Sequence, residues 1–551
     1  MTMEGKQVKD TTNSRTDTSL DGPDGVPDSR PDQVYPSGLS LVSIIIALDL
    51  AVFLVALDRT IIATATPRIT DHFNSLDDVA WYGSSYLLTY CTFQLLFGRV
   101  YTFYPPKWVF LAAIAIFEVG SAVCGAAPSS TIFIVGRAVA GLGAAGIFSG
   151  AVVIIVDSVP LHKRPMYTGF LGAMFGISSV VAPLLGGAFT DRVSWRWCFY
   201  VNLPIGAVAV AVIMLILRTT QPPNPSPAKT LRERIWLLDP LGNLCFFPGI
   251  VCLLLALEWG GSKYAWNNGR IISLFVLFGV LTLAFIALQI QRQEQATVPP
   301  RIVMQRSIPP AMLYSLCVGA SMMLMVYYLP IWFQAIKGVS AMKSGLMNLP
   351  LVLSLVLGSI LAGILVSKLG YYTPFLLLGT ILSAVGIGLI TTFTPTTNLP
   401  KWLGYQVLYG LGLGVGMQQP NVAAQTVLPR QDVPTGIALL MFMQSLGGSL
   451  FLSVGENVFT NRLIGDLSSL SLQGVDVVQV VLGSGATDLR DKVAAQDLPP
   501  VLAAYNDSIR SVFIVALAVV CASIVGGLFV EWKSVKNPGA TQVADGQETS
   551  M

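Results

Sequence analysis

The sequence predicts an all-α membrane protein with fourteen transmembrane helices, organised as two six-helix repeats with a two-helix insert between them. Three observations support this fold class: the composition is strongly apolar, the apolar residues form fourteen separate runs, and three short motifs recur at a nearly constant offset. Hydrophobic residues make up 53% of the 551 positions and charged residues only 11%, whereas about 25% of residues are charged in a typical soluble domain. Most of this chain is therefore expected to face lipid.

Charge, cysteine content and motif content exclude several other classes of protein. The formal net charge of +3, with 33 basic residues, is too weak and too scattered for a nucleic-acid surface. The seven cysteines lie in or at the edges of apolar runs without metal-ligand spacing, so we expect small buried side chains rather than disulfides. Because no nucleotide-binding P-loop, metal pair or catalytic triad stands out, we expect no cofactor, no metal and no enzymatic activity.

Each apolar run has the length of a membrane-crossing helix, which needs about 20 mostly apolar residues. The runs lie near residues 41–63, 80–99, 108–127, 132–156, 166–189, 197–217, 239–258, 270–290, 309–333, 344–366, 373–393, 401–424, 435–457 and 511–530. The polar residues 1–38 are rich in Asp, Ser, Thr and Pro, which predicts a disordered tail. No short apolar core with a cleavage site precedes the first run, so a cleaved signal peptide is not expected.

Basic residues in the loops predict the orientation. With the N-terminus in the cytosol, the short inner loops hold 13 Lys and Arg and the short outer loops hold 8, which favours both termini inside. The predicted organisation is a cytosolic tail (1–38), an N-terminal six-helix half (39–217), a linker with two inserted helices (218–308), a C-terminal six-helix half (309–530) with a long outer loop (458–508), and a cytosolic tail (531–551).

An internal repeat relates the two halves. The matched motifs are Gly98 with Gly363, at an offset of 265; Arg137-x3-Gly141-Leu142-Gly143 with Gln406-x3-Gly410-Leu411-Gly412, at 269; and Thr168-Gly169 with Thr435-Gly436, at 267. Glycine-rich apolar helices can match by chance, but three matches in the same order favour a true repeat. Two six-span halves in parallel repeat are a transporter architecture, with the site at their interface near the midplane.

Charged residues lie inside two of the apolar runs. Asp58 and Arg59 come late in span one, and Arg137 lies in the outer half of span four. An ionisable group at bilayer depth costs about 2.5–3.5 kcal/mol on insertion scales, so it is usually paired or lines a cavity. Because span one runs outward and span four inward, we expect Asp58 and Arg137 at similar depth as a pair that couples proton and substrate. Arg59 is the alternative partner, and snorkelling to the outer surface or bonding to helix-end carbonyls are the structural alternatives.

Small residues form a stripe along span five. The stripe consists of Gly172, Gly176, Ser179, Pro183, Gly186 and Gly187, which fall within about 100° of one another on a helix. Such a stripe lets another helix approach closely, and Pro183 adds a kink or hinge. We therefore expect leucine at Gly176 or Gly187 to abolish transport. The pattern fits ordinary helix packing and a sliding seam between the halves equally well.

The remaining polar candidates are isolated. The acids Asp49, Glu118, Glu258 and Glu456 either bind a proton or simply end a helix. Asn506-Asp507-Ser508 is an Asn-x-Ser glycosylation acceptor in the expected outer loop 458–508. Asn506 is thus a predicted modification site, although its closeness to span fourteen would hinder the modification.

Five motifs carry a resemblance to a known family. They are Ala56-Leu57-Asp58-Arg59-Thr60-Ile61-Ile62-Ala63-Thr64-Ala65-Thr66-Pro67; Tyr101-Thr102-Phe103 through Lys107-Trp108-Val109-Phe110; Arg137-x3-Gly141-Leu142-Gly143; Ala182-Pro183-Leu184-Leu185-Gly186-Gly187; and Ser194-Trp195-Arg196-Trp197-Cys198-Phe199-Tyr200-Val201-Asn202-Leu203-Pro204-Ile205-Gly206. Through them the chain resembles the major facilitator superfamily, specifically its fourteen-span drug:proton antiporters and, among these, fungal pumps that export mycotoxins and other secondary metabolites.

The resemblance implies the major facilitator fold and proton-coupled efflux of a hydrophobic small molecule such as a toxin, secondary metabolite or drug. It also implies a monomer in the cell membrane, with a vacuolar or vesicle membrane as the alternative, and with protons and lipid as its other partners. Two departures stand out. Thr102 and Pro105 occupy the places of an Asp and a Gly in the loop that makes a gating salt bridge in many relatives, and Ser178 and Ala182 replace glycines in span five.

Other functions remain open at this point. An importer or facilitator of a small metabolite or siderophore would have the same architecture, and only the span-five signature favours export. An integral-membrane enzyme would need clustered carboxylates or histidines at a membrane face, and the only adjacent acid pair, Asp77-Asp78, is expected to lie solvated in an outer loop. The sequence does not name the substrate, because contact with one methylene changes selectivity by only about 1–3 kcal/mol.

Overall fold

The computed structural model describes residues 35–75, 78–225, 230–261, 263–469 and 497–536. The helices before the insert are α1 (Gly38–Phe73), α2 (Val79–Phe103), α3 (Pro106–Ala126), α4 (Ser130–Ser158), α5 (Arg164–Arg192), α6 (Trp197–Tyr200) and α7 (Asn202–Ile216). The insert contains α8 (Leu231–Trp236), α9 (Pro240–Trp259), α10 (Gly269–Arg292) and α11 (Pro300–Val303). The remaining helices are α12 (Ile308–Lys337), α13 (Ala341–Met347), α14 (Leu349–Leu369), α15 (Thr373–Ile390), α16 (Leu399–Met417), α17 (Gln419–Val427), α18 (Val433–Ser469) and α21 (Leu498–Phe529).

Twelve helices among the described residues are long and apolar enough to cross a membrane. The all-α membrane fold is therefore confirmed, but the predicted count of fourteen spans is not. The two other predicted spans, 80–99 and 401–424, correspond to α2 and α16, which have 25 and 19 residues and are not among the twelve. Polar side chains such as Gln94 lower the apolarity of α2, and α16 ends at Met417, with Gln418 between it and the start of α17 at Gln419.

Several helices run past the predicted span boundaries. The long outer loop expected at 458–508 is wrong at both ends, because α18 continues to Ser469 and α21 begins at Leu498. Leu463 and Leu467 lie one helical turn apart on α18 and are 1% and 2% exposed, so packing of this apolar edge supports the extension. Residues 470–496 lie outside the described residues.

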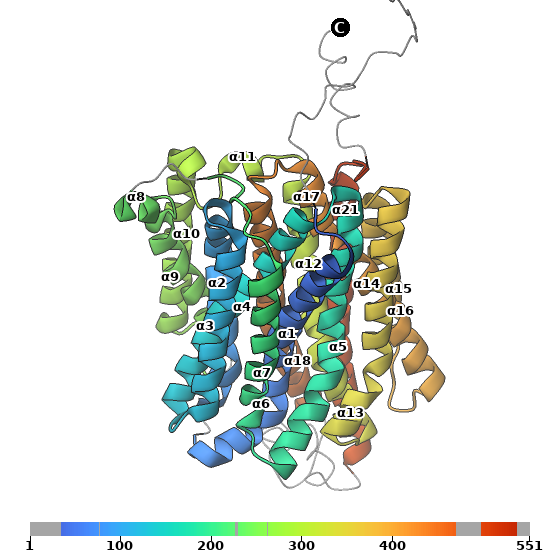
Figure 1. The fold of residues 1–551 in the computed structure, drawn as a ribbon. Helices are drawn as coiled ribbons and strands as arrows, with labels where there is room; N and C mark the ends of the chain where they lie inside the picture. Colours follow the sequence, from blue (N-terminus) through green and yellow to red (C-terminus); the bar gives the residue numbers. More distant parts are fainter. Residues whose placement is uncertain (1–34, 76–77, 226–229, 262, 470–496, 537–551) are drawn as a thin grey trace, which may run out of the picture. The chain divides into compact units, whose positions relative to one another are not determined.

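The helices pack in groups that follow the chain. Before the insert, α4 packs on α2 and α3, and α1 packs on α5 and α7. After it, α16 packs on α14 and α15, and α12 packs on α18 and α21. The insert helices α9 and α10 lie side by side next to α2 (Figure 1). Two further contacts, α5 with α14 and α2 with α18, join the first group to the second.

These two joining contacts are built alike from glycines. A methyl group placed on Gly98 of α2 would lie 3.1 Å from the carbonyl oxygen of Pro434, at the start of α18. A methyl group on Gly363 of α14 would lie 2.5 Å from the carbonyl oxygen of Pro165, at the start of α5. The two glycines are 265 residues apart and the two prolines 269, so these contacts recur at the offset of the sequence repeat.

Candidate functional site

A buried ion pair joins Asp58 on α1 to Arg137 on α4. The Nη1 atom of Arg137 lies 2.5 Å from Oδ2 of Asp58, and the two side chains are 1% and 0% exposed. The Nε atom of Arg137 also donates to the carbonyl oxygen of Tyr82 on α2, at 2.9 Å. The structure thus selects Arg137 rather than Arg59 as the partner of Asp58, and it places the pair away from the surface.

Other polar and aromatic groups complete the surroundings of this pair. The Nδ2 atom of Asn202 on α7 donates to Oδ1 of Asp58 at 3.3 Å and to Oγ of Ser121 on α3 at 3.1 Å. The Arg137 guanidinium carbon lies 4.5 Å from the centre of the Tyr86 ring, a favourable cation–π distance. Five helices, α1 to α4 and α7, therefore contribute to one desolvated site. Sequence reasoning assigned no role to Asn202, although an amide inside an otherwise apolar stretch was a usable signal.

Arg59 points in a different direction from Asp58. Its Nη2 atom lies 3.6 Å from the sulfur of Met323 on α12, so this cation reaches from α1 toward the helices after the insert. The next residue, Thr60, has its hydroxyl 3.4 Å from that of Ser178 on α5. Asp58 and Arg59, adjacent on α1, thus have different partners: Asp58 belongs to the ion pair within the first group, and Arg59 contacts α12.

The small-residue stripe of α5 contacts α14 and α1, but Gly187, one of its predicted members, does not face either helix. A methyl group on Gly176 would come 2.5 Å from Val356 of α14, whereas one on Gly186 would overlap the Thr64 hydroxyl of α1. Near Gly172, the neighbour is Gln418 at 3.0 Å. A methyl group on Gly187 would meet nothing within 4 Å, which corrects our expectation of a tight contact there. Gly187 faces away from both neighbouring helices.

Pro183 lies inside α5, which runs without a break from Arg164 to Arg192. A methyl group on Gly345 of α13 would lie 3.9 Å from the Pro183 ring. Pro183 therefore borders the helices after the insert without ending its own helix.

The environment of Asn506 differs from our expectation of an exposed acceptor. The residue lies within α21 and is 5% exposed. Its Oδ1 atom accepts from the Trp332 indole at 2.8 Å, and its Nδ2 atom donates to the carbonyl oxygen of Phe393 at 3.2 Å. A glycan on this amide would displace both hydrogen bonds and the packed indole, so the folded structure disfavours the predicted modification of Asn506. The amide ties α21 to α12 instead.

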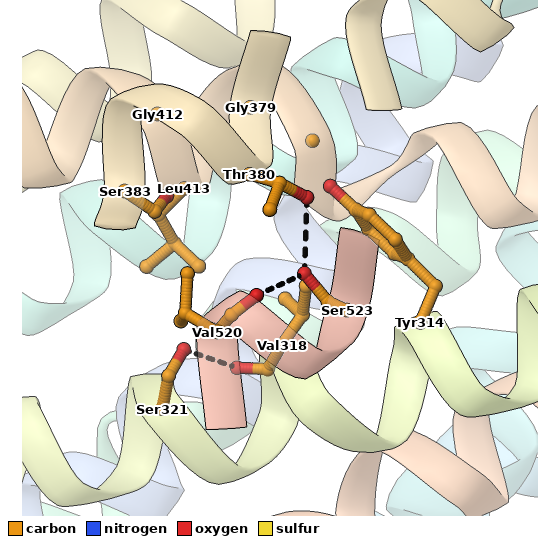
Figure 2. A pocket seen from close by; sticks show the side chains of 11 residues that line it. Tyr314, Val318, Ser321, Gly379, Thr380, Ser383, Gly412, Leu413, Val520 and Ser523 are labelled. Atoms are coloured by element: carbon orange, nitrogen blue, oxygen red, sulfur yellow. Dashed lines mark hydrogen bonds between the residues drawn. The ribbon is translucent and has the colours of Figure 1, made fainter. Parts of the chain in front are cut away.

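A small cavity of about 10 Å³ lies between α12, α15, α16 and α21 (Figure 2). Five hydroxyl-bearing residues line it: Tyr314, Ser321, Thr380, Ser383 and Ser523. Thr380 and Ser523 lie within hydrogen-bond distance, 3.0 Å, and Tyr314 donates to the carbonyl oxygen of Leu376 at 3.1 Å. A cavity of this size has room for one water-sized molecule, so it is a polar packing site rather than a pocket for a drug-sized ligand.

Comparison with known proteins identifies the family. Residues 48–452 match the family described as Major Facilitator Superfamily. The chain belongs to this superfamily. It is 55% identical over 511 residues to the MFS-type transporter VdtG of Byssochlamys spectabilis, covering 93% of this chain and 91% of the relative. It is 54% identical over 529 residues to the MFS-type efflux pump MFS1 of Arthroderma benhamiae, covering 95% and 98%.

The fold of a major facilitator protein is also found among solved structures. The human organic anion transporter MFSD10 (TETRAN) superposes with a TM-score of 0.57, covering 88% of this chain and all of that one (100%), at 13% sequence identity. At this identity the likeness shows a shared fold and nothing finer. The sequence-based expectation of the major facilitator fold is thereby confirmed.

In this superfamily member, ion pairs near the ends of α4 and α11 join the same two groups of helices. Asp157, at the end of α4, lies 2.6 Å from Arg430 in the loop before α18. Arg301 of α11 pairs with Asp432 in the same loop and with Glu294, and these hydrogen bonds raise the pKa of the Arg301 guanidinium. The insert therefore takes part in the contact at this end of the bundle.

The C-terminal end of α2 contributes to the same end of the bundle without the acid expected at Thr102. The Thr102 hydroxyl lies 3.4 Å from that of Thr435 on α18, and Arg99 donates to the carbonyl oxygens of Leu237 and Glu294 at 3.1 and 2.8 Å. Hydroxyl and backbone contacts thus stand where many relatives were expected to have a salt bridge.

Proposed function

We propose that this chain exports a hydrophobic small molecule in exchange for protons, and that the Asp58–Arg137 pair is the coupling site. The observation that carries the proposal is a carboxylate and a guanidinium paired at 2.5 Å with almost no exposure. The direction of transport rests on similarity, because a relative of 54% identity is named an efflux pump. An importer would use the same fold in the opposite direction.

The coupling step follows from the cost of a buried charge. While Arg137 contacts Asp58, each charge compensates the other in surroundings that water does not reach. When substrate or a movement of α4 draws Arg137 away, an unpaired carboxylate in the membrane interior is strongly unfavourable. Asp58 then takes a proton, and the hydrogen bond from Asn202 holds the carboxyl group in place. Proton and substrate therefore alternate in one cycle.

The proposal includes fourteen spans, with α2 and α16 as interior spans. Each of the two packs among helices that are long and apolar enough to cross a membrane: α2 between α4, α9 and α18, and α16 between α14 and α15. A helix surrounded by protein can carry more polar residues than one facing lipid. Residues 39–217 and 309–530 are then the two moving halves, 218–308 is the linker with the insert, and 1–38 and 531–551 are cytosolic tails.

In this scheme, alternating access requires the two glycine contacts described above to open and close. The α5–α14 and α2–α18 contacts and the Asp157–Arg430 ion pair close the end of the bundle that carries α8 and α11 (Figure 1). With the N-terminus in the cytosol this is the cytosolic end, and loading of substrate requires these contacts to separate. The protein acts as a monomer in the cell membrane in this scheme.

Inside-out vesicles with an imposed pH gradient test the proposal. We expect wild-type vesicles to accumulate at least one compound from a panel of hydrophobic aromatic molecules only when the lumen is acidic. Asp58→Asn vesicles should lose this accumulation, whereas Arg462→Gln, which breaks the Arg462–Asp466 ion pair on α18, should keep it. Accumulation that requires an alkaline lumen would indicate an importer, and equal accumulation without any gradient would refute proton coupling.

A further inference from the structure

A second carboxyl group, Glu118 on α3, lies buried near the coupling site without a partner. Both of its carboxyl oxygens are shielded from solvent, and neither has a hydrogen-bond partner among the described residues. An ionised carboxylate in such surroundings lacks both water and a counter-charge, which is costly inside a membrane protein. Neither the fold nor the ion pair of Asp58 and Arg137 accounts for this group.

The space for Glu118 is provided by a glycine on the neighbouring helix. A methyl group on Gly206 of α7 would overlap Oε1 of Glu118, so only glycine leaves room for the carboxyl group. Gly206 follows Asn202 on α7 by one helical turn, and Glu118 precedes Ser121 on α3 by one turn. Because Asn202 bonds both Ser121 and Asp58, Glu118 lies about one turn, roughly 5 Å, along the helices from the coupling site.

The seam between α3 and α7 borders the outside of the bundle at this level. Val119, next to Glu118, is 57% exposed, and Ala207, next to Gly206, is also exposed. Both side chains are apolar and would face lipid in a membrane. A small apolar reagent dissolved in the bilayer therefore has a short route to the Glu118 carboxyl group.

We infer that Glu118 is a proton-binding site, held as a neutral carboxylic acid between α3 and α7 while Asp58 is paired with Arg137. The charge that acts on it is that of Asp58 on α1, and Asp58 in turn pairs with Arg137 on α4 and accepts a hydrogen bond from the neutral Asn202 on α7. The negative charge of Asp58 disfavours a second negative charge at Glu118. This role deepens the proposed proton coupling and rests on it.

Labelling with dicyclohexylcarbodiimide tests the protonation of Glu118. A protonated carboxyl group adds to this apolar reagent: its proton moves to a carbodiimide nitrogen and its oxygen bonds the central carbon, and rearrangement gives a stable N-acylurea with no atom lost. We expect peptide mass spectrometry of the purified full-length protein at neutral pH to find this adduct on Glu118. Absence of the adduct in wild-type protein would overturn the inference.

Two variants test whether the label reports the site inferred here. In Asp58→Asn, loss of the neighbouring negative charge should let Glu118 ionise or pair with Arg137, so its labelling should fall several-fold. In Gly206→Ala, the added methyl group should displace the carboxyl group and change the labelling rate. The matched control Gly279→Ala in α10, where a methyl group meets nothing within 4 Å, should label like wild type. Labelling that is the same in wild type and Asp58→Asn would contradict the coupling of the two groups.

The labelling needs neither substrate nor a gradient, so its outcome is separable from that of the vesicle experiment. If efflux proves independent of the gradient while the label on Glu118 still depends on Asp58, proton antiport is refuted and the proton-binding site stands. If efflux is gradient-driven but Glu118→Gln transports like wild type and no label appears, antiport stands and the role of Glu118 is refuted.

Discussion

Arg137 on α4 and Gln406 on α16 occupy equivalent places in the repeat, 269 residues apart, and both donate to a backbone carbonyl of a neighbouring helix. Arg137 Nε bonds the carbonyl oxygen of Tyr82 at 2.9 Å, and Gln406 Nε2 bonds that of Met347 at 3.1 Å. Tyr82 and Met347 are themselves 265 residues apart. The two surroundings therefore share the same backbone contact.

The surroundings of Arg137 and of Gln406 differ in charge. Arg137 also binds the buried carboxylate of Asp58, whereas Gln406 donates its second hydrogen bond to the carbonyl oxygen of Trp402 on its own helix. The residue 267 positions after Asp58 is the apolar Met325, which is fully buried. Because one copy of this arrangement is neutral, the helix packing does not require an ion pair. The charge in the other copy is better explained by function than by folding.

Removing the two equivalent side chains should have very different effects. Arg137→Ala leaves Asp58 buried without its partner, and breaking such a pair typically costs about 3–5 kcal/mol. Asp58 can lower this cost by taking a proton, so we expect the protein still to reach the membrane but to lose gradient-driven efflux. Gln406→Ala removes two neutral hydrogen bonds, worth about 1 kcal/mol each, and should keep most of the activity. Vesicle efflux and thermal stability, measured together, check this; equal loss of efflux in both variants would remove the distinction.

A conservative change at the charged place should give an intermediate result. Arg137→Lys keeps the positive charge but lacks the planar fork that bonds Asp58 and the Tyr82 carbonyl group together. We expect efflux between that of wild type and that of Arg137→Ala under the same gradient. Full activity in the lysine variant would mean that charge alone, without this geometry, is sufficient.

The contact between the two regions can be tested at the α5 stripe. Gly176→Leu would press a large side chain against Val356 of α14, and overpacking of this kind costs about 1–3 kcal/mol, so the closed arrangement and transport should both suffer. Gly187→Leu, one leucine on the same helix with open space around it, is the matched control and should transport normally. Unchanged efflux in Gly176→Leu would show that this contact is not tight during transport.

A smaller effect is expected at Asn506, which makes its hydrogen bonds to Trp332 and Phe393 and not to the charged site. Asn506→Ala removes the hydrogen bonds to Trp332 and Phe393, and leaving buried polar groups unpaired costs about 1–3 kcal/mol. We expect a lower melting temperature with little change in gradient dependence. Because we expect no glycan on Asn506, treatment with a glycosidase should change the electrophoretic mobility of the wild-type protein no more than that of Asn506→Ala. A mobility shift seen in the wild-type protein and lost in Asn506→Ala would show that the amide is exposed during synthesis.

Much of the fold could be predicted from the sequence, because a long apolar run in a membrane forms a membrane-spanning helix. Two of the predicted spans were harder: α2 and α16 are helices, yet neither is among those long and apolar enough to be assigned as spans by composition alone. Helix ends also escaped prediction, because α18 and α21 continue outside the apolar runs through packing of residues such as Leu463. Burial of Asn506 depends on contacts with distant segments, which a local acceptor motif does not reveal.

The site was predictable only where charges stood out against an apolar background. The sequence located Asp58 and Arg137 by the cost of burying them, but it did not exclude Arg59, since neighbouring residues on a helix point in different directions that only the packing defines. Asn202 was missed because a neutral amide is less conspicuous than a charge. Gly187 was included wrongly, because a 100° sector is wider than the contact of one helix with its neighbours.

The central claim is that Asp58 couples protons to transport rather than merely binding substrate or supporting the fold. Proteoliposomes containing Asp58→Asn test it most directly when two modes are compared, accumulation driven by a pH gradient and exchange of labelled for unlabelled substrate without a gradient. The account predicts that the variant loses gradient-driven accumulation but retains exchange, since Arg137 and the packing around it remain. Full gradient-driven accumulation by Asp58→Asn would contradict the account and remove Asp58 from the mechanism.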